Sequence, residues 1–344
     1  MAKTLTVSLR WLGGACCALI LSGAVVALAP RTTAQGQNQN SNQAQPKKKK
    51  LPPGAKGFEQ YAGRDASDKL ITGGATRGGL CPGCPPPKAV EVAITHGLDA
   101  FFEAEQAAQP QEAAAKYKEA EDAFRQATVA DPKNFKAWSS LAWTYETEKK
   151  YKEAADAYRH AVKLTPAAPA PESAEPDVET QLLMAYFNLG NVLAADNQHA
   201  QAVEAFRQVS SVRPAYPQTY YNIGLSYVAL GGHDQDAINA FQEAVTRFKA
   251  LVAKDPDYSN PVFEQAYYNL GLLYSKSDKP EDAAKAAEAF RQAVKLDPNH
   301  AEARYNLGLI YYLTDNRPGL IEQQKALLTT KPELAKELAK LMSQ

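Results

Sequence analysis

Apolar residues in this chain recur at helical spacing in pairs of stretches, and turns separate the stretches. This spacing predicts α-helices with one apolar face. Every second helix carries an alanine followed four residues later by an aromatic residue, which places both on one face. The five pairs are Ala120/Phe124, Ala154/Tyr158, Ala202/Phe206, Ala237/Phe241 and Ala286/Phe290.

The helix that precedes each of these has a complementary pattern, in which a small residue follows a large aromatic one. The pairs are Trp138/Ala142, Tyr186/Gly190, Tyr220/Gly224 and Tyr267/Gly271, and Gly308 occupies the small position once more. A small residue there lets the second helix approach closely. One such hairpin cannot bury its own apolar face, so the hairpins must stack on one another.

Prolines mark the end of each helical pair and set the period of the chain. Pro132, Pro166, Pro214, Pro256, Pro298 and Pro332 are separated by 34, 48, 42, 42 and 34 residues. Upstream stand four related segments, which begin at Phe187, Tyr221, Tyr268 and Tyr305 and read Phe/Tyr-Asn-Leu/Ile-Gly. A 34-residue period with this pattern resembles the tetratricopeptide repeat (TPR) family.

The resemblance implies an all-α, right-handed superhelical solenoid of about six helix-turn-helix repeats with a C-terminal capping helix. We expect the TPR domain at 90–344, with repeats near 90–134, 135–168, 183–216, 217–257, 264–300 and 301–334 and a cap at 333–344. In the first repeat we expect a helix near 90–109, an alanine-rich insertion, and a second helix from Tyr117 to Ala130. Leu334, Leu338, Leu341 and Met342 form the apolar stripe of the cap.

Charge is unevenly distributed along a chain with 38 basic and 38 acidic residues. Residues 1–34 hold +3 and residues 35–90 hold +6, so residues 91–344 hold −9. An acidic body gives no support to nucleic-acid binding, which requires phosphate neutralisation. We therefore expect no nucleic-acid partner.

Residues 1–34 have the features of a secretory signal peptide. Lys3 and Arg10 precede the apolar stretch Ala15–Ala29, and Thr32-Thr33-Ala34 offers small residues for cleavage before Gln35. We expect an exported protein of the bacterial envelope, periplasmic or extracellular, with no membrane span after cleavage. The alternative is an inner-membrane anchor formed by residues 11–29, which are uncharged and just long enough to span.

Two segments separate the signal from the repeats. Residues 35–56 are rich in Gln, Asn and Lys and predict a disordered linker. Residues 57–89 are rich in Pro and Gly and contain Cys81-Pro-Gly-Cys84. We favour a disulfide between Cys81 and Cys84; a redox or metal role is the alternative, with His96 the one nearby further ligand.

No catalytic motif is present: the sequence lacks His-Glu-x-x-His, Gly-x-Ser-x-Gly and a phosphate-binding loop. We predict a protein that is not an enzyme and needs neither cofactor nor metal. The competing hypothesis is a thiol-redox or metal-handling module at Cys81 and Cys84, docked by the repeats.

The TPR resemblance implies a concave groove, lined by the first helix of each repeat, that binds a peptide or partner protein. The predicted lining is Phe187, Tyr221, Tyr268 and Tyr305, then Asn188, Asn222, Asn269 and Asn306, then Trp143, Leu225, Leu272 and Leu309. The asparagines could bond an extended peptide backbone, although part of this row could serve helix packing instead. A site for a C-terminal carboxylate is disfavoured, because only Lys136 is basic at the required positions.

Overall fold

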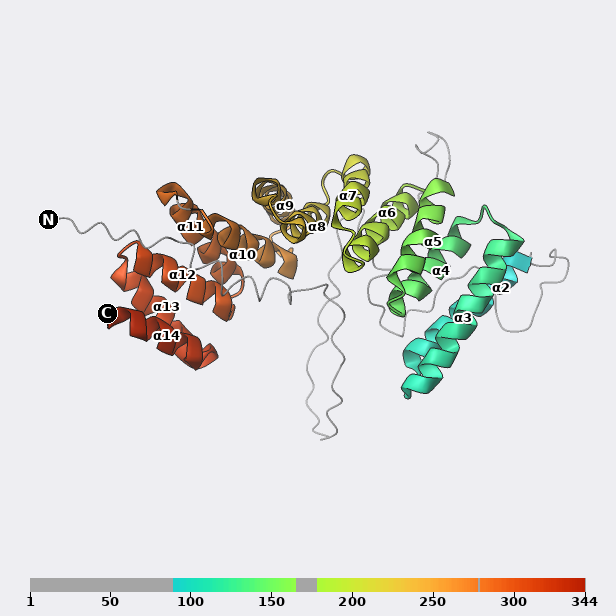
Figure 1. Ribbon diagram of the computed structural model, residues 1–344, viewed down its shortest axis with the longest axis horizontal. Coiled ribbons are helices and arrows are strands. Elements are labelled where there is room, and N and C mark those ends of the chain that lie inside the picture. Colours follow the sequence, from blue (N-terminus) through green and yellow to red (C-terminus); the bar gives the residue numbers. More distant parts are fainter. Residues whose placement is uncertain (1–88, 165–177, 278, 344) are drawn as a thin grey trace. The chain divides into compact units, whose positions relative to one another are not determined.

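The computed structural model describes residues 89–164, 178–277 and 279–343. These residues form thirteen α-helices and no strand (Figure 1). The all-α class and the helix-turn-helix architecture are therefore confirmed. The predicted signal peptide, the linker and the Cys81–Cys84 segment lie outside the described residues.

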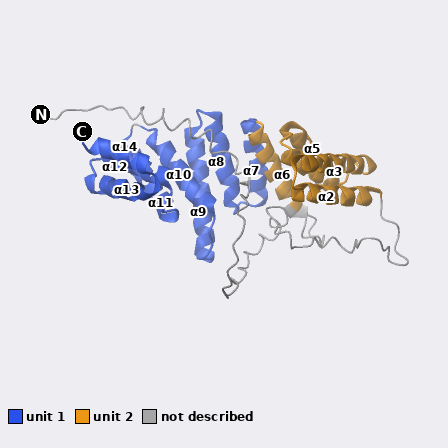
Figure 2. Ribbon diagram, turned by 90° about the horizontal axis from the view of Figure 1, so that it is seen from below, with its two compact units in different colours: residues 1–26, 197–344 blue, residues 27–196 orange. Residues whose placement is uncertain are grey.

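The described helices belong to two compact units, coloured separately in Figure 2. Unit 2 contains α2 (Ala89–Gln106), α3 (Pro110–Ala130), α4 (Phe135–Thr147), α5 (Tyr151–Leu164) and α6 (Val178–Ala195). Unit 1 contains α7 (His199–Val212), α8 (Pro217–Leu230), α9 (Asp234–Lys254), α10 (Pro261–Ser275), α11 (Pro280–Leu296), α12 (Ala301–Leu313), α13 (Arg317–Thr330) and α14 (Pro332–Met342).

Consecutive helices pack in antiparallel pairs within each unit. In unit 1, α8 packs on α9, α10 on α11 and α12 on α13; α8 also contacts α10, and α12 contacts α14. The core between them is built from alanines and aromatic rings, with Phe241, Phe248 and Phe290 almost fully buried.

Proline and asparagine fix where the helices start. Proline occupies the first turn of α3, α8, α10, α11, α13 and α14, where its missing N–H costs no hydrogen bond. Asn134 caps α4 by accepting a hydrogen bond from the backbone N–H of Ala137, and Asn260 caps α10 through Val262. The sequence therefore defines the starts of these helices strongly.

The close approach inside each hairpin follows from glycine. A Cβ on Gly97, Gly224 or Gly271 would lie within 2.5–2.7 Å of the ring of Phe124, Phe241 or Phe290 respectively. No side chain larger than hydrogen fits there without moving the ring, which explains the small residue in this position.

The first repeat differs from the sequence expectation. The alanine-rich segment is not an insertion between helices, because α3 starts at Pro110 rather than at Tyr117 and includes it. The proline at the first position and the run of strong helix formers after it extend the helix by two turns. The 21-residue α9 in unit 1 is equally long, so the extra residues of that repeat are also helical.

The last hairpin is closed by α14. Its Leu338 is fully buried and meets Gly308 of α12, where a Cβ would lie 2.6 Å from a leucine methyl. In the α8–α9 and α10–α11 hairpins an aromatic ring of the second helix faces the equivalent glycine, whereas α13 has Gln324 at the corresponding position. The apolar side chain that α13 lacks is supplied by α14.

Candidate functional site

The predicted groove residues of unit 1 lie on the first helices α8, α10 and α12. Their environments differ more than the repeating sequence suggests. Tyr221, Leu272 and Asn306 are buried, with 7% of each side chain exposed, whereas Leu225, Asn222, Tyr268, Asn269, Tyr305 and Leu309 are half-buried. The row is therefore partly a surface and partly a packing contact.

Tyr221 connects the first helices of two neighbouring repeats. Its hydroxyl donates to Gln265 Oε1 of α10 at 2.9 Å, and Asn269 hydrogen-bonds the same phenol group. Burial raises the pKa of Tyr221 to about 12, so the phenol stays neutral and able to donate. Asn269 thus serves a neighbouring tyrosine in this structure.

Tyr268 and Tyr305 are also engaged by their surroundings. The Tyr305 hydroxyl donates to Glu337 Oε2 of α14 at 2.8 Å. The Tyr268 ring lies against two rings of neighbouring helices, 5.9 Å from Phe290 and 4.6 Å from His300 between centroids. These contacts hold both tyrosines in defined orientations, which lowers the entropy cost of presenting their remaining surface to a ligand.

A continuous apolar stripe follows the exposed side of α12. Tyr305, Leu309, Tyr312 and Leu313 are spaced by four, three and one residues, so they share one helix face. Exposure rises along the stripe, to 39% for Tyr312 and 43% for Leu313. We call these four residues the α12 stripe; none of them is charged.

In unit 2 the predicted residues lie among aromatic and acidic side chains. Trp143 is half-buried and packs on Phe101, with 4.0 Å between ring centroids. Phe187 and Asn188 of α6 are half-buried, and Asn188 hydrogen-bonds the phenol of Tyr158. Tyr158 in turn donates to Glu146 Oε2 at 2.9 Å.

Glu146 is a residue that the sequence did not single out. Although part of its side chain reaches solvent, the carboxyl group is enclosed. Burial raises the pKa of Glu146 to about 7, and the hydrogen bond from Tyr158 opposes that rise only in part. This carboxyl group therefore titrates near neutral pH.

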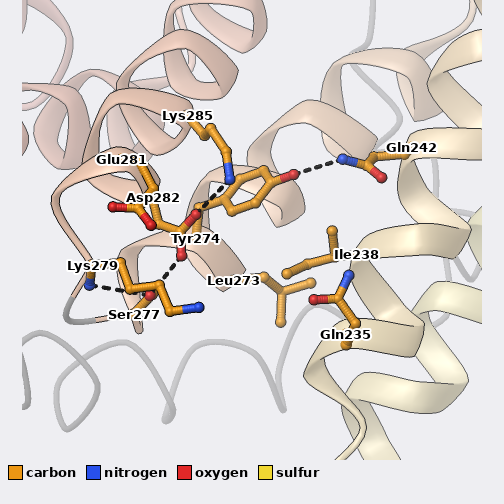
Figure 3. A pocket seen from close by; sticks show the side chains of 10 residues that line it. All are labelled: Gln235, Ile238, Gln242, Leu273, Tyr274, Ser277, Lys279, Glu281, Asp282 and Lys285. Atoms are coloured by element: carbon orange, nitrogen blue, oxygen red, sulfur yellow. Dashed lines mark hydrogen bonds and ion pairs between the residues drawn. The ribbon is translucent and has the colours of Figure 1, made fainter.

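A hollow of about 270 Å³ lies in unit 1 between α9, the end of α10 and the start of α11 (Figure 3). Its polar groups bond mainly to one another. Gln242 Nε2 donates to the Tyr274 hydroxyl at 2.6 Å, Ser277 donates to Asp282, and Lys285 pairs with Asp282 at 2.7 Å. Because these groups already satisfy each other, the hollow offers a ligand few unpaired donors or acceptors.

Cys81 and Cys84 lie outside the described residues, so the disulfide and its redox or metal alternatives remain predictions. Over residues 89–164, 178–277 and 279–343, no three His, Cys, Asp or Glu side chains gather in a way that could hold a metal ion. Within the same ranges no helix is both long and apolar enough to cross a membrane.

Family models match the regions that contain these hairpins. Residues 101–169 and 218–257 each match a model described as tetratricopeptide repeat, and residues 190–231 and 282–315 match one described as TPR repeat. The chain contains tetratricopeptide repeats. The predicted resemblance is thereby confirmed for the repeats, while the signal peptide stays a prediction.

Solved structures with similar folds share little sequence with these tetratricopeptide repeats. YrrB, whose structure is described as a TPR protein with an unusual peptide-binding site, is 21% identical over 64% of this chain and 99% of its own, with a TM-score of 0.46. MamA of Desulfovibrio magneticus is 17% identical over 62% and 98%, with a TM-score of 0.45. PilF of Pseudomonas aeruginosa is 16% identical over 73% and 97%, with a TM-score of 0.47. No curated protein matches the sequence.

Proposed function

We propose that this protein is a non-enzymatic scaffold whose tetratricopeptide repeats bind a peptide or partner protein along the first helices of unit 1. The observation that carries the proposal is the α12 stripe, where Tyr312 and Leu313 are exposed on a helix whose opposite face is buried. Tyr305 and Leu309 continue the stripe as half-buried residues. Exposed leucine and tyrosine side chains that share one helix face are a usual feature of binding surfaces.

The neighbouring helices add to this surface. Leu225 of α8 and Tyr268 of α10 are half-buried and stand at the repeat positions of Leu309 and Tyr305. We propose that a bound segment places its own apolar side chains against these residues, and that Asn222 contributes a polar contact. Because Asn269 hydrogen-bonds Tyr221, we propose that it holds this tyrosine in place beside the ligand and does not contact the ligand itself.

The export of the protein to the bacterial envelope remains part of the proposal. The basic and apolar pattern of residues 1–34 supports it.

Selection of a displayed random-peptide library on the full chain tests the binding surface. We expect apolar peptides whose affinity falls about tenfold or more in Leu313→Ser, because a buried leucine contact contributes about 1.5–3 kcal/mol. The matched control is Leu328→Ser, since Leu328 is 51% exposed on the second helix α13.

Equal affinities for wild type and Leu313→Ser would contradict the proposal. A loss that is equally large in Leu328→Ser would also contradict it, because binding would then not depend on the first helices.

A further inference from the structure

His300 occupies the junction where α10, the end of α11 and the start of α12 meet. Its Nε2 lies 2.9 Å from Oε1 of Glu264 on α10, and both side chains are largely buried, with 16% and 12% exposed. No donor in the described part of the chain makes a well-aligned hydrogen bond to this buried oxygen, so its contact with the imidazole is an electrostatic one. The strength of this contact therefore depends on whether the imidazole is charged.

The other ring nitrogen of His300 serves α12 itself. Nδ1 accepts a hydrogen bond from the backbone N–H of Ala303 at 3.3 Å and so caps the helix. It also lies 3.4 Å from Glu302 Oε2. A neutral imidazole can accept the Ala303 N–H through Nδ1 and so cap α12, while its Nε2–H faces Glu264. A protonated imidazole carries a hydrogen on Nδ1, so it loses the bond from Ala303 and can donate to Glu302 instead.

The groups around the imidazole decide which form is favoured. Burial and the N-terminal end of α12 oppose a positive charge. Glu264 of α10, Glu302 of α12 and Asp297 at the end of α11 favour it, and Tyr268 of α10 supplies the ring against which the imidazole packs. The contact with Glu264 and the three negative charges outweigh burial and raise the pKa of His300 above its usual 6.5.

We propose that protonation of His300 switches the contacts at the junction between the last two repeats. We call this arrangement the latch. Protonated His300 ties Glu264 of α10 to Glu302 of α12 and fixes the ring of Tyr268; neutral His300 instead caps α12 and leaves Glu264 with an uncharged partner. The latch is a property of the repeats themselves and goes beyond the proposed function. Its effect on binding, through Tyr268, rests on that function.

Nuclear magnetic resonance of the full chain between pH 5 and pH 8 tests the latch without a ligand. We expect the His300 ring to titrate above pH 6.5 and the Ala303 amide to shift with the same midpoint, because that amide loses its acceptor when Nδ1 is protonated. In Glu264→Gln the His300 midpoint should fall.

Another repeat of the same chain shows which residue can replace His300 as the cap of α12. Asn134 occupies the corresponding position before α4 and caps that helix at 3.0 Å. His300→Asn should therefore keep α12 capped while the Ala303 amide stops titrating. The latch stabilises the protonated form, so its contribution is complete below pH 6.5 and is lost as pH rises through the His300 midpoint.

The melting temperature of wild type minus that of His300→Asn should accordingly be larger at pH 5.5 than at pH 8. Taking this difference cancels other titrating groups that both proteins share, Glu146 among them. A His300 midpoint at or below 6.5, an Ala303 amide that does not follow it, or an unchanged midpoint in Glu264→Gln would each overturn the proposal.

Discussion

A glycine and an aromatic ring meet inside the α8–α9 and α10–α11 hairpins of unit 1. At Gly271 a Cβ would lie 2.5 Å from Cε1 of Phe290, whose side chain is 1% exposed. Protein interiors are packed too densely for the ring to move without cost. Single atoms at these positions therefore control how closely paired helices approach.

Gly271→Ala should lower the free energy of unfolding by about 1–3 kcal/mol, as overpacked cores do. The measurement is chemical denaturation of the purified chain. Because the clash is with the ring, Gly271→Ala should cost less in a Phe290→Leu background than in wild type. Equal costs in the two backgrounds would show that ring contact is not the cause.

Glu146 shows how one enclosed carboxyl group can make stability depend on pH. Its pKa is about 7 in the folded chain against an ordinary 4.5, so the folded state holds the proton more tightly. The stability that this provides is complete below pH 4.5 and is lost as pH rises to about 7.

At pH 8, Glu146→Gln should therefore have a higher melting temperature than wild type, and its free energy of unfolding should be larger by at most about 3 kcal/mol. This gain in stability should vanish near pH 4.5. Gln keeps an acceptor for the Tyr158 hydroxyl. Glu153→Gln on α5 is the control, since Glu153 is exposed and its replacement should change little. A gain that is the same at both pH values would contradict the role of the charge.

At the scale of elements, α14 completes the last hairpin. Leu338 is fully buried against Gly308, and Leu320 and Leu327 of α13 belong to the same cluster. Tyr305 of the α12 stripe donates to Glu337 of α14, so the cap also orients a residue of the proposed binding surface. The helix thus has both a packing and a positioning role.

Leu338→Ala should cost about 2–5 kcal/mol of stability in thermal or chemical unfolding, because it leaves a cavity in a small cluster. Removal of 332–344 should additionally cause self-association, measured by light scattering, as the buried face of α13 becomes exposed. Lys340→Ala on the exposed side of α14 should stay within about 0.5 kcal/mol of wild type. Wild-type stability in Leu338→Ala would rule out the capping role.

Helical pairs could be predicted from the sequence because each repeat carries the same local signals. The Gly–Phe pairs fix hairpin packing, and prolines mark the starts of helices such as α8 and α10. Helix lengths could not be predicted in the same way. Nothing in the repeat pattern fixes how far a helix extends, so α3 includes the alanine-rich segment expected as an insertion, and α9 is equally long.

At the scale of the whole molecule, the site was predictable only as a row of positions. The sequence places Tyr221 and Asn269 at adjacent positions of the repeat pattern in successive repeats, but their hydrogen bond depends on how those repeats stack. The same holds for His300 and Glu264, which are 36 residues apart and meet only in the folded unit. Contacts between repeats are not local, and residue spacing alone does not reveal them.

Export concerns the whole chain and has a direct test. If residues 1–34 are a cleaved signal peptide, the exported protein begins at Gln35. Intact-mass measurement of the protein from a bacterial envelope fraction should show a chain that lacks residues 1–34. A membrane-bound species that retains the N-terminus would support the anchor at residues 11–29 instead.

If the first helices of unit 1 form the binding surface, the methyl resonances of their leucines should respond when a ligand binds. A peptide selected on the full chain should be titrated into leucine-methyl-labelled protein. We expect shifts for Leu309 and Leu313 of the α12 stripe and for Leu225 of α8, with Leu328 of α13 unchanged. Shifts that centre on Leu328 or on Leu296 of α11, with the α12 stripe unmoved, would contradict it.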